Sequence, residues 1–372
     1  MGKTTQIRLM SAQLAALMEV GKAFNSVIKV DELLQLVASK TSQLLGAERC
    51  SIYVVDMEQR VLWTRAALGT PRIEISLDSG IAGAVVRNQG LVNVPVAYDD
   101  PRFNASVDRQ TGFRTRSILA SPLFDAQREV IGVLQLLNSR RGEFSEEDEE
   151  MLTSLAGFAG SALQNALLFE ELKTSFHSVL AVLAATVDAK HPLTAGHTAR
   201  VAEYTCGIAE IAGIQPSEIE MLRVAAYLHD YGKIGVRDAI LTKPDRLTPD
   251  EYEEMKQHAV KTTEILSRMH FMRQYAAAPL IAGFHHEKWD GSGYPKRLKG
   301  KDIPVGARIM AMADVFDAIT ADRDYRKGVS VEQAMEYMRT QVGTAFDPEL
   351  FVHFETYVRK RFDVPPPSRR RG

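Results

Sequence analysis

The sequence predicts an α+β N-terminal half, a long connecting helix and an all-helical C-terminal half. Three observations carry this prediction. Short apolar runs bounded by turn residues occur only in the first 140 or so residues, and strands have this pattern. From Ser145, apolar residues recur at helical spacing for about forty residues. From Phe176 onward the spacing stays helical, with Gly and Pro marking the breaks. A chain of 372 residues is long enough for two such domains.

Composition excludes several classes of function. Hydrophobic residues make up 45% and charged residues 25%, as in globular proteins that fold in water. The formal net charge of -2 gives no basic field, so we expect no nucleic-acid partner. Cys50 and Cys206 lie far apart in the chain and are expected to be reduced thiols. No apolar run reads as a membrane span and no signal peptide is evident, so we expect no membrane partner and a cytoplasmic location.

The N-terminal half begins with a predicted helix over residues 11–45, which Gly46 ends. A turn-rich loop is expected over Tyr98–Asn104. Four strands are predicted, at residues 51–56, 61–64, 117–120 and 130–136. Helix, sheet and helix together predict an α+β domain of the kind that senses signals.

The connecting helix starts at an acidic run, Glu146–Glu149, which favours a helix N-terminus. About forty residues make a helix of roughly 60 Å. A helix of that length packs against something along its course, so we expect a parallel partner helix and a homodimer through the N-terminal domain and this helix. Two core helices with a break remain the alternative. The expected divisions are residues 1–168, 145–190 and 175–365, with a disordered tail at 366–372.

Histidine is concentrated in the C-terminal half. Of nine histidines, seven lie between His191 and His286. Lone histidines such as His270 and His353 read as surface or capping residues. Imidazole suits first-row transition metals, a carboxylate can bridge two of them, and two ions about 4 Å apart activate a shared water for phosphodiester attack. The candidate ligands are His197, His229, Asp230, His258, His285, His286 and Asp314.

Two segments make the interpretation specific. His229–Gly235 and His285–Pro295, the second containing Gly-Tyr-Pro, resemble the HD-GYP family of the HD phosphohydrolase superfamily. Flanking segments match as well, namely Thr194–His197, Ala313–Ala318 and Asp322–Arg326. The resemblance runs from about residue 174 to 362.

The resemblance implies hydrolysis of cyclic di-GMP to pGpG, GMP or both, by attack of a metal-bridging hydroxide. It assigns one metal to His197, His229 and Asp314. It assigns the second to His258, His285 and His286, with Asp230 bridging both. Lys233 would stabilise the developing charge on the phosphate. The substrate contacts that it implies are Tyr294, Arg323 and Arg326.

One departure from the family pattern bears on the number of metals. Relatives with a third metal carry a glutamate where this chain has Leu193, which cannot ligate, so we expect a binuclear site. Asp188 lies nearby as a partial substitute. The run Lys190–Leu193 also departs from the family pattern at the rim of the site. The family implies iron or manganese, while the donor set leaves zinc and cobalt open.

The N-terminal half resembles a GAF domain over about residues 29–168. The resemblance rests on Asp99–Asn104, Thr111–Leu119 and the set Asn138, Phe144, Asp148 and Glu149. It is closest in pattern to the GAF domains that bind cyclic nucleotides, but Ser139 replaces the signature lysine, so that internal Lys–Asp ion pair is missing. Three interpretations stay open: a cAMP or cGMP site, a site for another small molecule, or a dimerisation module. Candidate ligand contacts are Ser51, Asp108, Thr111 and Thr115.

The sequence thus predicts a cyclic di-GMP phosphodiesterase regulated by its GAF domain. Two alternatives remain open. One is a catalytically weak receptor or scaffold that binds the dinucleotide. The other is a hydrolase of a different cyclic dinucleotide, such as 3',3'-cGAMP.

Overall fold

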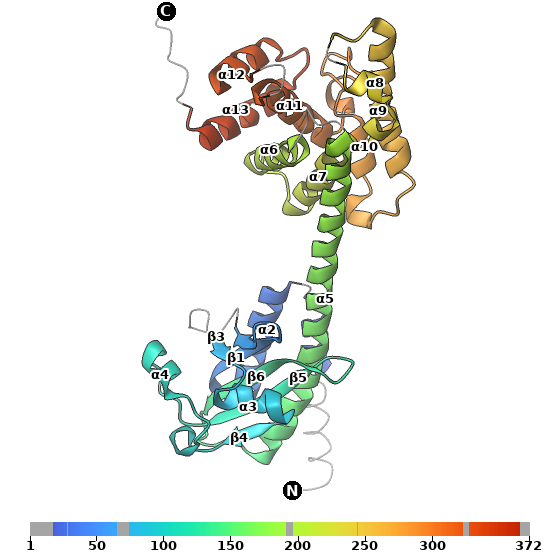
Figure 1. Ribbon diagram of the computed structural model, residues 1–372. Coiled ribbons are helices and arrows are strands. Elements are labelled where there is room, and N and C mark those ends of the chain that lie inside the picture. Colours follow the sequence, from blue (N-terminus) through green and yellow to red (C-terminus); the bar gives the residue numbers. More distant parts are fainter. Residues whose placement is uncertain are drawn as a thin grey trace, which may run out of the picture. The chain divides into compact units, whose positions relative to one another are not determined.

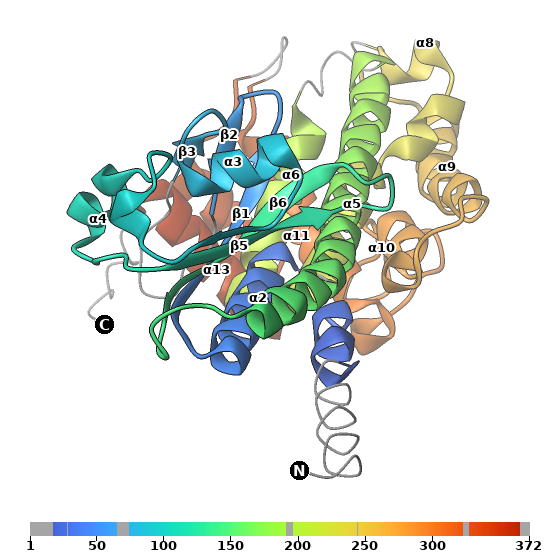
Figure 2. The same ribbon diagram turned by 90° about the horizontal axis from the view of Figure 1, so that it is seen from below.

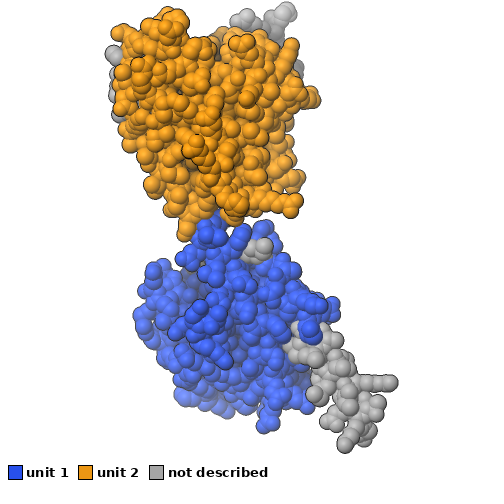
Figure 3. Space-filling model, turned by 90° about the vertical axis from the view of Figure 1, so that its right-hand side faces the viewer, with its two compact units in different colours: residues 1–174 blue, residues 175–372 orange. Residues whose placement is uncertain are grey.

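The computed structural model describes residues 18–27, 29–64, 74–190, 196–243, 245–322 and 327–364. The chain divides into two compact units, Met1–Thr174 and Ser175–Gly372, coloured separately in Figure 3. Expectations at Leu193, His191, Arg323, Arg326 and the 366–372 tail lie outside the described residues.

The first unit is built on one antiparallel sheet of order β3-β2-β1-β6-β5-β4 (Figures 1 and 2). The two longest strands pair in the middle, with Cys50 opposite Leu136 and Ile52 opposite Leu134. The strands are β1 (Ala47–Asp56), β2 (Val61–Trp63), β3 (Glu74–Ser76), β4 (Val92–Val94), β5 (Ile118–Phe124) and β6 (Val130–Ser139).

Helices cover both faces of this sheet, which is why its central strands are apolar on both sides. Cys50 and Ile52 face the core formed with α2 (Val30–Leu45) and the start of α5 (Glu146–Lys190). Tyr53, one residue on, belongs to the opposite core with α3 (Gly80–Asn88). A short helix, α4 (Ala105–Thr111), and a 3-10 turn, η1 (Ala97–Asp99), complete the unit.

The N-terminal helix differs from its prediction. Residues 18–25 are helical, but the chain leaves the helix at Ser26 and enters α2 only at Val30. The side chains of Asn25 and Ser26 donate to the carbonyls of Gly21 and Ala23, the local bonding by which such residues end helices. Residues 11–17 lie outside the described part. The short strands β3 and β4, and helices α3 and α4, were not predicted.

The connecting helix is confirmed as one uninterrupted element, α5, of 45 residues. Its first turns bury Leu152, Leu155 and Leu163 in the core of the first unit. Near its end, Leu180 belongs to the core of the second unit. The alternative of two helices with a break is therefore excluded.

One property of α5 was not foreseen. Within the described residues it is long and apolar enough to cross a membrane by length and composition alone. Its most apolar window has a mean hydropathy of 1.2 and is 44% buried inside the protein. The apolar residues of its first half are accounted for by packing on the sheet, as in any core helix.

The second unit is helical, as predicted. Among the described residues its only strand-like pairing is an isolated bridge between Val342 and Phe346. Its core gathers large buried side chains such as Tyr275, Phe316 and Phe354. The helices are α6 (His197–Ile211), α7 (Pro216–Leu228), η3 (Tyr231–Gly235), α8 (Asp238–Leu241), α9 (Pro249–Leu266), η4 (Arg273–Tyr275), α10 (Ala278–Gly283), η5 (Gly300–Asp302), α11 (Val305–Thr320), α12 (Val331–Thr340) and α13 (Pro348–Phe362).

The two cysteines are free, as predicted, and both are buried. Burial raises the pKa of the Cys50 thiol, and raises that of Cys206 to about 11. Neither is a reactive thiolate at neutral pH.

Candidate metal centre

The candidate ligands come from five places in the second unit and meet at one point. Their positions are His197 at the start of α6, His229 and Asp230 between α7 and η3, His258 within α9, His285 and His286 directly after α10, and Asp314 within α11. Five of the seven are 7% exposed or less, and His286 and Asp314 are half-buried, so the site is inside the helical core.

The turn after α7 is locked onto α9. The Thr262 hydroxyl donates to the carbonyl of His229 at 3.0 Å and accepts from the amide of Gly232 at 2.8 Å. A Cβ at Gly232 would lie 2.0 Å from the backbone oxygen of His258, so only glycine permits this approach. The His229-Asp230 pair is thereby held opposite His258.

Helix α9 has a strong start that fixes its register. Thr248 and Glu251 form a capping box and Pro249 occupies the first turn. These signals place His258 on the face of α9 that points into the core, where it is 2% exposed.

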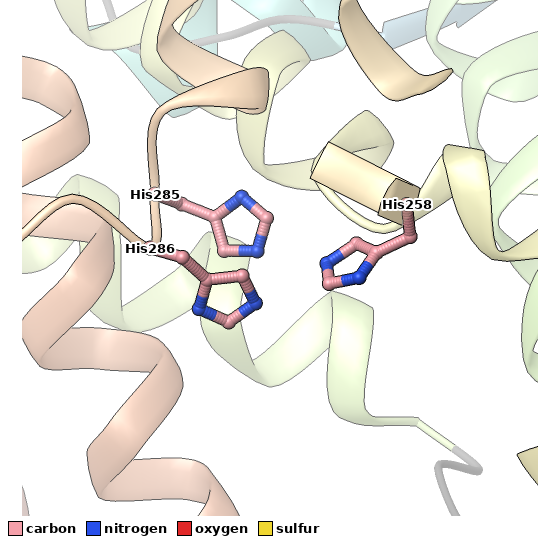
Figure 4. Close-up of side chains that lie close together, drawn as sticks. All are labelled: His258, His285 and His286. Atoms are coloured by element: carbon pink, nitrogen blue, oxygen red, sulfur yellow. The ribbon is translucent and has the colours of Figure 1, made fainter. Parts of the chain in front are cut away.

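Two groups of three side chains could each hold a metal ion, with ligand atoms within 4.8 Å of one another. A third group links them and contains His229, Asp230 and His285. Figure 4 shows His258, His285 and His286 turned toward one another. The two separate groups are His258, His285 and His286, and His197, His229 and Asp314. This is the same division that the family resemblance implied.

Asp230 lies between the groups with one oxygen toward each. Its Oδ2 is 3.4 Å from Nε2 of His229 and 3.8 Å from Nε2 of His197. Its Oδ1 is 3.5 Å from Nε2 of His258. A carboxylate placed this way can ligate an ion on each side.

Three of the histidines leave one buried nitrogen without a partner. His229, His258 and His285 each donate from Nδ1 to the carbonyl three residues earlier, at 2.7, 2.6 and 2.5 Å. Within the described residues their buried Nε2 atoms have no hydrogen-bond partner. Leaving one buried polar atom unpaired costs about 1–3 kcal/mol. Nδ1–H bonded to the backbone with Nε2 free is the arrangement of a metal-ligating imidazole, so the donor set fits a metal.

A residue not predicted as functional supports His197. Asp317 accepts from Nδ1 of His197 at 2.7 Å and is itself held by the Arg200 guanidinium. A carboxylate behind a ligating histidine fixes its tautomer and orientation. The available signal was the spacing of Asp314 and Asp317, which places both on one face of α11.

The buried imidazoles resist protonation. Burial lowers the pKa of His285 well below its usual value, and burial with the charge of His258 lowers that of His286 to about 3. Burial also lowers the pKa of His258. His197 differs: burial lowers its pKa, but Asp314 and Asp317 outweigh burial and raise it to about 9.

The carboxylates stay ionised despite their burial. Burial raises the pKa of Asp230, but Lys233 and His229 outweigh it and hold that pKa well below the usual value. His197 does the same for Asp314. Neutral imidazoles and ionised carboxylates are the protonation states that metal ligands need, and the proton on His197 is one that an ion would displace.

The predicted substrate residues are divided. The Lys233 ammonium donates to Oδ2 of Asp230 and is therefore inside the site. The Tyr294 ring lies 4.8 Å from the ring of His286. Arg323 and Arg326 fall outside the described residues. Asp188 accepts from the Thr198 hydroxyl at 3.0 Å and belongs to none of the three ligand groups.

The loop that carries Tyr294 is held by another unpredicted residue. The buried carboxylate of Glu287 accepts from the amides of Lys296 at 2.6 Å and Leu298 at 3.0 Å. A Cβ at Gly293 would lie 2.4 Å from the amide of Lys288, so the loop closes on itself there. Glu287 follows the two ligand histidines directly, but sequence alone could not show that it faces its own loop.

The first unit has a pocket of about 70 Å³, and all four predicted ligand contacts line it. Three of them are already engaged. Asp108 accepts from the amide and hydroxyl of Thr115, both at 2.7 Å, and from the Tyr98 hydroxyl at 3.0 Å. The Thr111 hydroxyl donates to Val107 at 2.9 Å. Ser51 is buried in β1 at the pocket wall.

The missing signature lysine is compensated locally. Asp148, its expected partner, forms an ion pair with Arg141 and accepts from the amide of Ser145 at 2.9 Å. Arg141, two residues after Ser139, thus forms an ion pair with Asp148 in place of the missing lysine.

Comparison with known families agrees with both halves of the fold. Residues 29–163 match the family model described as the GAF domain, and residues 181–350 match the HD domain. The chain therefore has a GAF domain followed by an HD domain.

Similar curated proteins are named as phosphodiesterases. The 3'3'-cGAMP-specific phosphodiesterase 2 of Vibrio cholerae is 38% identical over 227 residues, covering 60% of this chain and 43% of that protein. The 3'3'-cGAMP-specific phosphodiesterase 3 of Vibrio cholerae is 44% identical, covering 44% and 35%. A cyclic di-GMP phosphodiesterase of Thermotoga maritima is 38% identical, covering 53% of each. This chain thus spans about half or less of the length of these relatives.

Proposed function

We propose that this chain, a GAF domain followed by an HD domain, is a metal-dependent phosphodiesterase that hydrolyses a cyclic dinucleotide. The observation that carries the proposal is the set of three buried imidazole nitrogens that find no partner beside the carboxylate of Asp230. Isolated buried hydroxyls such as those of Thr41 and Thr205 also lack a partner, but these three imidazole nitrogens lie together in one donor set suited to divalent metals.

Two divalent ions supply the chemistry when bound: they lower the pKa of coordinated water and neutralise phosphate charge. His197, His229 and Asp314 would hold one, and His258, His285 and His286 the other. Asp230 would hold both. We expect iron or manganese, and two ions in place of three.

The remaining residues prepare the site for a phosphodiester. Asp317 keeps the Nδ1 proton of His197 on the outer side of the ring, which leaves its Nε2 facing the ligand carboxylates. The Lys233 ammonium beside Asp230 adds a positive charge where negative charge grows on the phosphate oxygens. The Tyr294 ring covers the side of His286 and offers an apolar face to the substrate.

Cyclic di-GMP is the substrate that the sequence favours, and 3',3'-cGAMP is a second candidate. The relatives support both, because their names include each of the two activities. The expected products from cyclic di-GMP are pGpG, GMP or both.

The deciding experiment measures hydrolysis of both dinucleotides by protein of known iron or manganese content. We expect turnover that rises with metal content and ends when the metal is removed with a chelator. Metal-loaded protein that binds a dinucleotide without cleaving it would instead indicate a receptor or scaffold.

We also propose that the GAF domain regulates the HD domain through α5 in a homodimer. Four apolar side chains along α5 are largely exposed: Leu168 (54%), Leu172 (60%), Val179 (53%) and Val182 (66%). Their spacing of four, seven and three is that of the apolar seam of a two-stranded coiled coil. Asn165, exposed and seven residues before Leu172, is the polar residue that such seams use to fix a parallel register.

Sedimentation velocity tests the dimer. Leu172→Glu should shift the protein to monomer, whereas Thr174→Glu, at an exposed position on the side of α5 away from the seam, should leave a dimer. Because Leu172 is exposed, its replacement removes no packing within the chain. A dimer that survives Leu172→Glu would contradict the proposed seam. A cAMP or cGMP at the GAF pocket could act only by favouring one arrangement of the helices over another.

A further inference from the structure

A second pocket lies beside the metal centre and has no assigned role. It has a volume of about 510 Å³, within the range of about 300–1,000 Å³ of ligand sites. One wall is α9 and the other is the loop that follows His286. Tyr294 lines the pocket and also lies 4.8 Å, ring to ring, from His286. The Tyr294 ring therefore lies between the pocket and the metal ligands. In a nucleotide one sugar lies between the base and the phosphate, so a base in this pocket would leave its phosphate near the metal ligands.

The pocket offers ring faces and a cation together. The Lys256 ammonium lies 4.7 Å from the ring centroid of Tyr252 and 5.8 Å from that of Tyr294. Tyr252 is 48% exposed, so its ring is available to a ligand. Nucleobases stack on exposed aromatic side chains of this kind.

A donor and an acceptor stand side by side on the α9 wall. Lys256 forms an ion pair with Glu253, one turn earlier on the helix. Glu253 is 66% exposed, so this pair is a surface one and costs little to rearrange. Guanine carries an acceptor, O6, beside two donors, N1–H and the N2 amino group, and adenine presents a donor and an acceptor in the reverse order. The Glu253 carboxylate can accept from N1–H and the N2 amino group of guanine together, whereas the same edge of adenine offers one donor and one acceptor.

The remaining lining charges suit a dinucleotide. Lys288 and Arg297 are also lining residues, so the walls carry three cations and one carboxylate. This excess positive charge favours a ligand that brings phosphates with it.

We infer that this pocket holds a guanine base of the cyclic dinucleotide, with Lys256 donating to O6 and Glu253 accepting from N1–H and the N2 amino group. The inference rests on the proposed function and sharpens it. Cyclic di-GMP and 3',3'-cGAMP each contain the guanine that the pocket takes, while cyclic di-AMP does not.

The test compares kcat/KM for cyclic di-GMP, cyclic di-AMP and bis(p-nitrophenyl) phosphate, a diester without a base, in metal-loaded full-length protein. The wild type should prefer cyclic di-GMP to cyclic di-AMP by about a hundredfold or more. Glu253→Gln and Lys256→Met should each lower the ratio of cyclic di-GMP to bis(p-nitrophenyl) phosphate hydrolysis by about tenfold. Lys29→Met, which removes a lysine from an exposed Lys–Glu pair of the same spacing in the GAF domain, should leave that ratio unchanged.

The outcomes separate the two proposals. Equal use of cyclic di-GMP and cyclic di-AMP by the wild type, or an unchanged ratio in both α9 variants, overturns the guanine pocket and leaves the phosphodiesterase standing. If the wild type cleaves no diester, the proposed function fails. Calorimetric binding of cyclic di-GMP against cyclic di-AMP then still tests the pocket, which requires guanine-selective binding lost in Glu253→Gln.

Discussion

The GAF pocket and the HD metal centre both contain buried polar side chains, but they differ in how those polar atoms are satisfied. In the GAF pocket, Asp108 uses its carboxylate on Thr115 and Tyr98, so the site is complete without a ligand. In the HD domain, Nε2 of His229, His258 and His285 has no hydrogen-bond partner among the described residues. The metal centre of the HD domain therefore has buried nitrogens that a ligand would satisfy, whereas the Asp108 carboxylate in the GAF pocket is already satisfied.

This difference indicates how far function can be inferred for each half. The cost of burying unpaired imidazole nitrogens is a stability loss that a bound metal removes. The GAF pocket imposes no such cost, so its fold is compatible with a small molecule, a cyclic nucleotide or no ligand at all. Substitutions at each site test whether the two sites differ in this way.

The largest effect is expected from Asp230→Ala. Losing the carboxylate that faces both ligand groups should remove metal binding and lower turnover by at least about a thousandfold, since metal stabilisation of the transition state is worth several kcal/mol. The GAF domain should unfold as in the wild type. Metal analysis, turnover and calorimetry on one preparation check this, and wild-type turnover would show that the site is misassigned.

Lys233→Ala should lower turnover by about a hundredfold, the scale of losing one transition-state donor. Metal content should stay at the wild-type level, because Lys233 is not a ligand. Comparing kcat at matched metal content checks this. An unchanged kcat would remove Lys233 from the mechanism.

Asp108→Ala tests the other half of the comparison. It should destabilise the GAF domain by about 1–3 kcal/mol, because it leaves buried donors of Thr115 unpaired. Metal content of the HD domain should not change. Chemical denaturation followed by a GAF-specific probe measures the effect. A stable variant would mean that Asp108 is free for a ligand after all.

Acidification should act on one domain only. The folded-state pKa of His258, His285 and His286 lies below the unfolded value of about 6.5, so their contribution to stability is present above pH 6.5 and is lost as pH falls below it. His197, whose pKa is raised, opposes this, but it is one group against three.

In metal-free protein, the unfolding temperature of the HD domain should therefore fall by about 4 °C or more between pH 7 and pH 5. The GAF domain, Met1–Thr174, contains no histidine and should change little over the same range. Differential scanning calorimetry with chelator present separates the two transitions. Equal shifts in both would contradict the assignment of buried neutral imidazoles.

Sequence alone predicted the features that local pattern determines. The helical spacing after Ser145 gave α5 as one element, and the motifs at His229 and His285 named side chains that the fold brings together. The three-residue strands β3 and β4 were missed, because three residues show no periodicity and pair only through the folded sheet.

The residues that support the site were also not predicted from the sequence. Spacing places Asp317 on the same face of α11 as Asp314, but only the packing of the folded chain shows that Asp317 meets His197 and that Glu287 meets the Tyr294 loop. The pair Glu253 and Lys256 reads in sequence as an ordinary surface pair on a helix, and only the position of Tyr294 beside Lys256 gives it a pocket to face.

We propose that the imidazoles of His229, His258 and His285 lack hydrogen-bond partners among the described residues because they hold catalytic metal. The most direct measurement titrates metal-free protein with manganese or ferrous ion while recording bound metal per chain and hydrolysis of cyclic di-GMP and 3',3'-cGAMP. We expect turnover of a dinucleotide to rise from zero and to reach its plateau at two bound ions per chain. Turnover by the metal-free protein, or none in protein that has bound two ions, would contradict it.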